Sequence, residues 1–164
     1  MATTFTHVGI AVVDHEQSRR FYIEALDFEP SITIDANDET FPGLPKLLEV
    51  DDADVLAEFL TNGPQTIELV SYAHPGSAGG GDRRPMNTRG LTHLCFLVDD
   101  VDEVAGKIAS FGGQVLDETR IAHDQPDGIE REYLMCLDPN GVRIELIRAG
   151  KLPNTGDEPQ LTRR

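Results

Sequence analysis

The chain has 164 residues, 39% of them hydrophobic, and a formal net charge of −15 at pH 7. This length can bury the core of one domain or of two small fused modules. So negative a surface repels phosphate backbones and anionic lipids, which excludes nucleic acids and membrane surfaces as expected partners. No apolar run approaches the roughly 20 residues of a membrane-spanning helix, and the first residues, MATTFTHVGI, lack a signal-peptide pattern. We therefore expect a cytoplasmic protein.

The first half of the chain predicts one helix among four strands. The segment HEQSRRFYIEAL spaces its apolar residues as on one helix face, and Asp14 before it suits a helix N-cap. Strands, rich in β-branched and aromatic residues, are predicted at residues 5–13, 28–35, 55–60 and 66–72. An apolar patch of Phe41, Leu44, Leu47 and Leu48 interrupts a polar stretch. This patch is expected either to cover a substrate or to contact a second subunit.

The same order of elements then returns. Residues 74–90, HPGSAGGGDRRPMNTRG, have the composition of a linker. After it we predict a helix at residues 101–111 and strands at 91–98, 114–121, 131–137 and 142–148. The sequence thus divides into a first βαβββ module, a linker, a second βαβββ module and a flexible polar tail, at residues 1–73, 74–90, 91–148 and 149–164.

The repeat predicts the architecture. THVGIAVVD in the first half returns as THLCFLVDD in the second, so the chain carries an internal duplication. Each module is too small to bury its own sheet alone. We therefore predict an α+β fold in which the two modules pair into one structure.

Alternation along four of the strands separates polar from aliphatic residues. Successive strand residues point to opposite faces of a sheet, and each of these strands opposes one polar residue to an aliphatic row. The four polar residues are His7, Glu68, His93 and Glu145. Two imidazoles and two carboxylates on one open face suit a divalent ion such as Zn, Ni, Co, Fe or Mn. A metal would also stabilise a carboxylate that lies among aliphatic neighbours.

The repeated text resembles the vicinal oxygen chelate superfamily, which includes glyoxalase I, methylmalonyl-CoA epimerase, extradiol dioxygenases and bleomycin-resistance proteins. The matching segments are THVGIAVVDHEQSRRFY, TIELVS, GLTHLCFLVDDVDEV and DPNGVRIELI, within residues 5–148. The resemblance implies that the two paired βαβββ modules form a curved mixed sheet around a metal-binding cup, in which the metal binds two neighbouring substrate oxygens. It implies that the metal ligands are His7, Glu68, His93 and Glu145. In some branches of the superfamily, the residue at the position of Glu68 is not a ligand. Such folds often dimerise, so we expect a homodimer.

Residues outside this set have simpler interpretations. A histidine taken singly is more often structural than a ligand, and His15 in the first helical turn is expected to face solvent. Arg89 in the linker and His123 in a loop are the candidate substrate-binding residues, because loops carry many binding residues and arginine pairs with carboxylates and phosphates. Cys95 and Cys136 lie in strand-like segments and are expected to be buried, reduced thiols.

The preferred chemistry is proton transfer on a small molecule that chelates the metal through two neighbouring oxygens. In an isomerase or lyase of the glyoxalase I or epimerase kind, Glu68 or Glu145 would serve as the catalytic base. The epimerase branch carries glutamine at the position of Glu68, which favours a glyoxalase-like site.

Two alternatives remain open at the level of sequence. An iron(II) extradiol dioxygenase needs only His7, His93 and Glu145, but Met135 stands where that branch has a second-shell tyrosine. A non-catalytic, drug-binding protein would suit the acidic surface, but such proteins usually lack the metal residues that this chain keeps.

Overall fold

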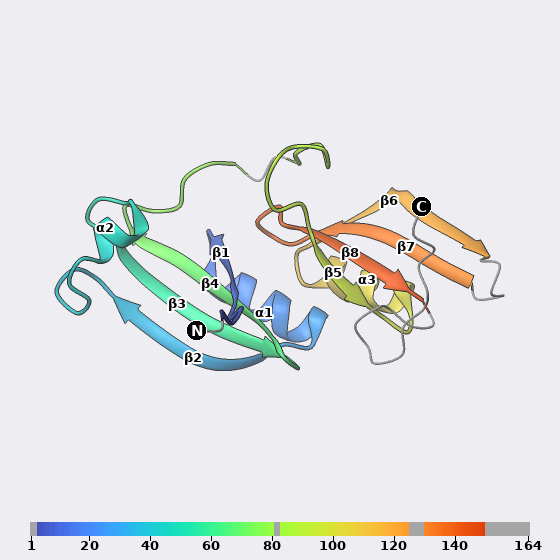
Figure 1. Ribbon diagram of the computed structural model, residues 1–164. Helices are drawn as coiled ribbons and strands as arrows, with labels where there is room; N and C mark the ends of the chain where they lie inside the picture. Colours follow the sequence, from blue (N-terminus) through green and yellow to red (C-terminus); the bar gives the residue numbers. More distant parts are fainter. Residues whose placement is uncertain (1–2, 81–82, 125–129, 150–164) are drawn as a thin grey trace. The chain divides into compact units, whose positions relative to one another are not determined.

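The computed structural model describes residues 3–80, 83–124 and 130–149. The chain forms two compact units, Met1–Asp82 and Arg83–Arg164 (Figure 1). Their division lies inside the predicted linker, while the module boundaries at residues 73 and 91 stay a prediction. The predicted tail, apart from Ala149, lies outside the described residues.

The first unit is a four-stranded mixed sheet with two helices. Its elements are β1 (Val8–Val12), α1 (His15–Leu26), β2 (Glu29–Ala36), α2 (Leu44–Leu48), β3 (Asp54–Asn62) and β4 (Gln65–His74). The strand order is β1-β4-β3-β2. β1 pairs in parallel with β4, whereas the pairs β4–β3 and β3–β2 are antiparallel.

The second unit repeats this topology. Its elements are β5 (Leu94–Leu97), α3 (Val101–Ser110), β6 (Gln114–Asp124), β7 (Glu130–Leu137) and β8 (Arg143–Arg148). The order β5-β8-β7-β6 again places the first strand in parallel beside the last. The α+β class and the two βαβββ modules are thereby confirmed, as two four-stranded sheets rather than one continuous sheet of hydrogen-bonded strands.

The duplication extends to the register of the strands. In the first unit Gly9 lies opposite Glu68, and in the second unit Cys95 lies opposite Glu145. The residue before each of these pairs is also matched, Val8 with Ile67 and Leu94 with Ile144, so corresponding residues occupy corresponding places.

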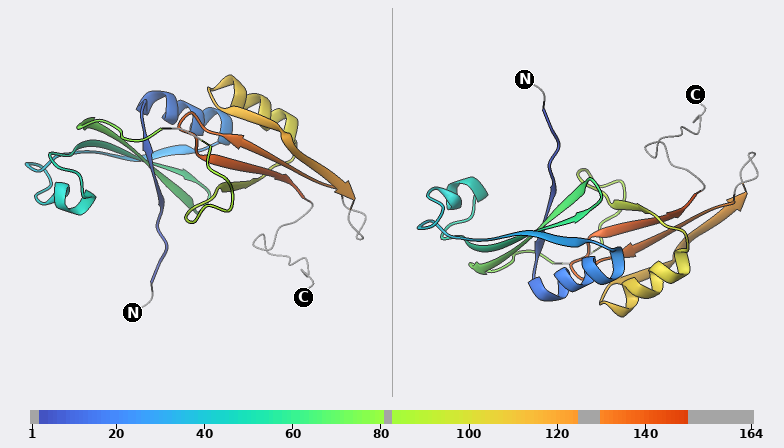
Figure 2. Two further views of the ribbon diagram at one scale, coloured as in Figure 1. Left: turned by 90° about the horizontal axis from the view of Figure 1, so that it is seen from above. Right: turned by 90° about the horizontal axis from the view of Figure 1, so that it is seen from below.

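One long helix covers one face of each sheet (Figure 2). Its start is fixed by an aspartate whose carboxylate accepts a backbone N–H three residues on: Asp14 from Gln17 and Asp100 from Glu103, both at 2.9 Å. In α1 the apolar side chains of Phe21, Tyr22, Ala25 and Leu26 are buried. The aliphatic residues of β4 and β8 that alternate with Glu68 and Glu145 are buried too, whereas these two glutamates are only partly buried. The polar residue of each strand therefore points away from the helix.

The short helix α2 was not predicted as a helix. Its Leu44 is buried in a small cluster with Ala36, Ala53 and Val55, against which Leu48 also packs. Leu47 and Phe41 are exposed, so the predicted apolar patch is split between core and surface. Among the helices described, none has the length and apolar character to cross a membrane.

Candidate metal centre

The first unit brings His7 and Glu68 together. His7 stands just before edge strand β1, and Glu68 lies in the neighbouring β4. The imidazole Nε2 is 3.4 Å from a carboxylate oxygen of Glu68, and the two side chains are 36% and 23% exposed. Gly9 faces Glu68 across the register, and a Cβ at this glycine would lie 3.4 Å from Oε2 of Glu68. The glycine therefore keeps space free beside that carboxylate.

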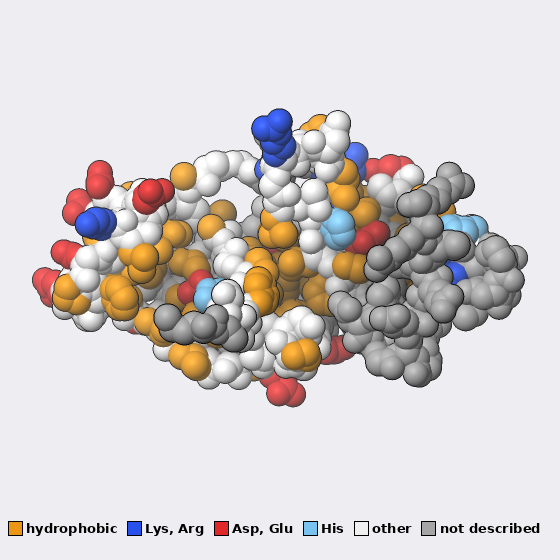
Figure 3. All heavy atoms as spheres, viewed as in Figure 1, with side chains coloured by type: hydrophobic (Ala, Val, Ile, Leu, Met, Phe, Trp, Pro, Cys, Tyr) orange, Lys and Arg blue, Asp and Glu red, His pale blue; other side chains and the backbone are white. Residues whose placement is uncertain are grey.

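The second unit brings His93 and Glu145 together in the same way. Nε2 of His93 lies 3.2 Å from Oε2 of Glu145, with side chains 28% and 19% exposed. Figure 3 shows histidine side chains beside acidic ones, among hydrophobic side chains, on the viewed face of the molecule. Both histidine–glutamate pairs are thus partly shielded from water and still open enough to receive a ligand.

The separation of the atoms in each pair fits a shared ion. Two ligands about 2.1 Å from one metal lie about 3.0 Å apart in octahedral geometry and about 3.4 Å apart in tetrahedral geometry. The observed 3.4 and 3.2 Å lie in this range. Within the described residues, no cluster holds three or more His, Cys, Asp or Glu side chains placed for a metal. Each unit therefore supplies two donors.

Neighbouring side chains differ between the two pairs. The rings of Phe59 and His7 form a T-shaped contact, with centroids 5.2 Å apart, and Phe59 lies opposite Glu68 in the register. In the second unit Met135 lies opposite Glu145. An aromatic ring therefore supports the first pair, and a flexible thioether stands at the equivalent place beside the second.

Cys95 also distinguishes the second pair. The residue is exposed on its edge strand, against the expectation of a buried thiol, whereas Cys136 is buried as expected. Partial burial of the thiol, reinforced by the charge of Glu145 and by a hydrogen bond to it, raises the pKa of Cys95 to about 12. This thiol is therefore protonated at neutral pH and a poor nucleophile.

The two predicted substrate-binding residues lie in the second unit. His123 was expected in a loop but lies in β6, because a register irregularity between Leu116 and Ile121 is followed by further pairing with β7. Its ring stacks on that of Tyr133, with centroids 5.9 Å apart. Arg89 is exposed. A role for either residue in substrate binding stays a prediction.

Sequence reasoning missed a polar cluster beneath α1. His15 was expected to face solvent, yet its side chain is only 14% exposed. Its Nε2 lies 3.1 Å from Glu58 and its Nδ1 3.1 Å from the Ser71 hydroxyl. Arg19 donates from Nε to the other oxygen of Glu58 at 3.0 Å. These residues are far apart in sequence, so no local spacing could have indicated the cluster.

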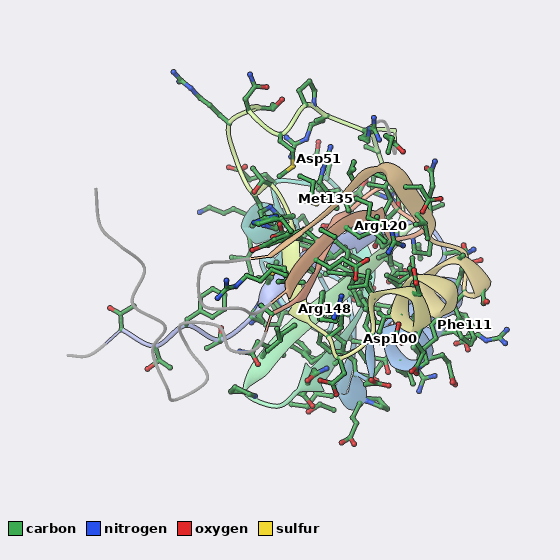
Figure 4. The ribbon with its side chains drawn as sticks, turned by 90° about the vertical axis from the view of Figure 1, so that its right-hand side faces the viewer. Asp51, Asp100, Phe111, Arg120, Met135 and Arg148 are labelled. Carbon is green, nitrogen blue, oxygen red and sulfur yellow. The ribbon has the colours of Figure 1, made fainter. Side chains whose placement is uncertain are left out.

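The second unit has a different charged cluster in the corresponding region. Glu132 of β7 accepts hydrogen bonds from Arg120 and Arg148, and Arg120 also donates to Asp102 at the start of α3. Figure 4 labels the two arginines, which come from β6 and β8. Both clusters connect a helix to its sheet on the face away from the histidine–glutamate pair.

Comparison with known proteins identifies the family. Residues 4–146 match the model of the Glyoxalase/Bleomycin resistance protein/Dioxygenase superfamily. No curated protein sequence matches the chain closely enough to count as a relative.

Solved structures share the fold at low identity. A glyoxalase family protein from Bacillus cereus is 15% identical with a TM-score of 0.75, over 91% of this chain and 95% of that one. Glyoxalase I from Zea mays is 24% identical with a TM-score of 0.58, over 90% of this chain and 45% of that longer one. The trypanothione-dependent glyoxalase I of Leishmania major is 20% identical with a TM-score of 0.57, over 90% and 87%. By the match of nearly its whole length to the family model, the chain belongs to the glyoxalase/bleomycin resistance protein/dioxygenase superfamily.

Proposed function

We propose that the protein is a divalent-metal-dependent isomerase or lyase of the glyoxalase I type, acting on a small molecule with two neighbouring oxygens. One ion, of Zn, Ni, Co, Fe or Mn, is held by His7 and Glu68 together with His93 and Glu145. The observation that carries this proposal is the doubled pair: each unit presents one imidazole nitrogen and one carboxylate at 3.4 or 3.2 Å, the spacing of neighbouring ligands.

The chain's own residues divide the work. When bound, the ion would act as a Lewis acid that polarises the chelated oxygens and acidifies the adjacent C–H bond. Glu68 or Glu145 takes the proton from one carbon and returns it to its neighbour. Both carboxylates are partly shielded, which strengthens their interactions with a developing charge. Arg89 and His123 are proposed to contact the substrate away from the reacting carbons.

The choice of a glyoxalase-like reaction over the alternatives depends on two residues. Glu68 stands where the resembling epimerases carry glutamine. Met135 lies opposite Glu145 and stands where the resembling extradiol dioxygenases carry a tyrosine; unlike a tyrosine hydroxyl, its thioether cannot donate a proton. We also propose that the protein is cytoplasmic and homodimeric, and sedimentation of the purified protein tests the oligomeric state.

Metal stoichiometry tests the shared site. We expect one ion per chain in the parent protein and its loss in both His7→Ala and His93→Ala, because neither pair alone supplies enough ligands. His74→Ala is the matched control, since His74 is exposed and bonds only to the backbone oxygen of Asp52 among the described contacts. Two ions per chain, with one surviving in each variant, would show separate sites and contradict the proposal.

Turnover tests the reaction class. We expect a 2-oxoaldehyde mixed with a thiol to be consumed without oxygen uptake by the metal-loaded protein, and not by the His93→Ala variant. Ring cleavage of a catechol with oxygen uptake, after anaerobic loading with iron(II), would instead establish the dioxygenase. Tight binding of a cationic drug by a protein that takes up no metal would establish the binding module.

A further inference from the structure

Each candidate metal-binding histidine has the same neighbour on its far ring nitrogen. The hydroxyl of Thr6 lies 3.0 Å from Nδ1 of His7, and the hydroxyl of Thr92 lies 2.9 Å from Nδ1 of His93. In both units the other nitrogen, Nε2, faces a glutamate. The arrangement therefore occurs twice, once in each unit, at corresponding places of the repeated sequence.

The imidazole must change its protonation pattern when an ion binds. A neutral ring carries one N–H, on either nitrogen. In the metal-free protein Nε2 faces a carboxylate, which can only accept, so the N–H belongs on Nε2 and Nδ1 is an acceptor. An ion at Nε2 requires its lone pair, so the N–H must then lie on Nδ1 and needs an acceptor there.

A hydroxyl is suited to both states because it donates one hydrogen bond and accepts others. A carboxylate or a backbone carbonyl at Nδ1 would serve only the metal-bound form. A backbone N–H would serve only the metal-free form.

We propose that Thr6 and Thr92 are positioning residues that partner both tautomers of His7 and His93, donating to bare Nδ1 without metal and accepting from Nδ1–H when Nε2 binds the ion. The proton released from Nε2 passes to solvent and another is taken up at Nδ1, so the charge of the ring does not change. This inference rests on the proposed metal site and concerns residues outside its ligand set.

The first test measures metal affinity by competition with a chelating dye. We expect Thr6→Val and Thr92→Val each to weaken Zn²⁺ binding about tenfold, the lower end for a lost outer-shell partner, because both threonines are exposed. Thr6→Ser and Thr92→Ser keep the hydroxyl and should bind as the parent does. Thr33→Val, at an exposed position in β2, controls for an added methyl group. Equal affinity in the valine and serine variants would overturn the proposal.

The second test reads the rings directly, and its metal-free part does not depend on the proposed metal site. In ¹⁵N spectra of the metal-free parent at alkaline pH, we expect His7 and His93 as the Nε2–H tautomer. The Zn²⁺-loaded parent should show the Nδ1–H tautomer, and the valine variants should be mixed without metal. Unchanged spectra in the valine variants would overturn the role of the threonines. A parent that takes up no metal would instead overturn the proposed function, and the metal-free spectra would still decide for or against the threonines.

Discussion

The two units share one face and differ on the other. On the face opposite the long helix, each unit places a Thr-His dipeptide just before its edge strand and a glutamate on the neighbouring last strand. The Thr–His and His–Glu distances agree between the two units within 0.2 Å. Beneath the long helix the two units have unrelated polar clusters. The register of the parallel strand pair therefore positions the histidine–glutamate pairs, and the polar groups under the helix are free to differ.

The polar cluster beneath the helix is more buried in the first unit than in the second. Glu58 is only 5% exposed and is satisfied by His15 and Arg19. The Glu132 side chain is 14% exposed, against 7% for that of Glu58, and is satisfied by Arg120 and Arg148. These two arginines are about a third exposed, as is Arg19, but the first unit also holds His15, which is only 14% exposed. Each cluster joins a helix to its sheet through one carboxylate, and the carboxylate of the first unit is the more desolvated of the two. The two clusters should therefore contribute different amounts to the free energy of unfolding.

The largest expected effect concerns the two glutamates, which the proposed mechanism treats as alternatives. Gly9 leaves room beside Glu68, whereas Cys95 stands beside Glu145. We therefore expect Glu68 to be the mobile base, so that Glu68→Gln lowers kcat about 10²- to 10⁴-fold while metal is retained. Glu145→Gln should mainly weaken metal binding. The reverse pattern, measured by steady-state kinetics and metal analysis, would assign the base to the second unit.

A second effect concerns the thiol that only the second unit has. With a pKa of about 12, about one part in ten thousand of Cys95 is thiolate at pH 8, so alkylation should run roughly a thousandfold slower than at an ordinary thiol. Glu145→Gln removes a negative charge and an acceptor, which lowers the pKa of Cys95 and speeds the reaction. Mass spectrometry of the metal-free protein locates the label and separates it from buried Cys136.

The same experiment can be moved to the first unit. Gly9→Cys places a thiol opposite Glu68, and we expect it to react as slowly as Cys95. A fast reaction there would show that the two glutamates lie in different environments despite their matching register.

A third effect compares the clusters beneath the helices. Glu58→Ala leaves His15 and Arg19 without their buried acceptor and should cost about 2–4 kcal/mol of unfolding free energy. Glu132→Ala should cost about 1–2 kcal/mol, because both of its partners are about a third exposed and can regain water, whereas His15 in the first cluster is only 14% exposed. Urea unfolding of both variants, with exposed Glu16→Ala as control, measures the difference. Equal losses would remove the distinction between a buried and a hydrated cluster.

Much of the fold was predictable because the signals were local and occurred twice. The helix of HEQSRRFYIEAL was predicted with the bounds that the structure gives it, since an N-cap and apolar spacing define it within twelve residues. The histidines and glutamates could be grouped because strand alternation and the repeat together placed them on one face. That the four residues bind one ion stays a prediction.

The misses have a common physical origin in tertiary contacts. Helix α2 has only five residues and begins beside Pro45, too short for a helical period to show. The burial of His15 depends on Glu58 and Ser71, which lie 43 and 56 residues away. The strand at His123 exists because β7 pairs with it beyond a register irregularity. None of these partners can be recognised from residues near them in the sequence.

The smallest expected effect concerns a feature that is the same in both units, the aspartate at the start of each long helix. Asp14 and Asp100 accept from the third residue of their helices at the same distance of 2.9 Å. Asp14→Ala and Asp100→Ala should therefore each cost about 1 kcal/mol, while asparagine at either position should cost little. Amide hydrogen exchange at Gln17 and Glu103 reads the two helix starts separately, and each alanine should accelerate exchange only in its own unit. Acceleration at both sites by either change would mean that the units open together, so that the differences between them act on one shared stability.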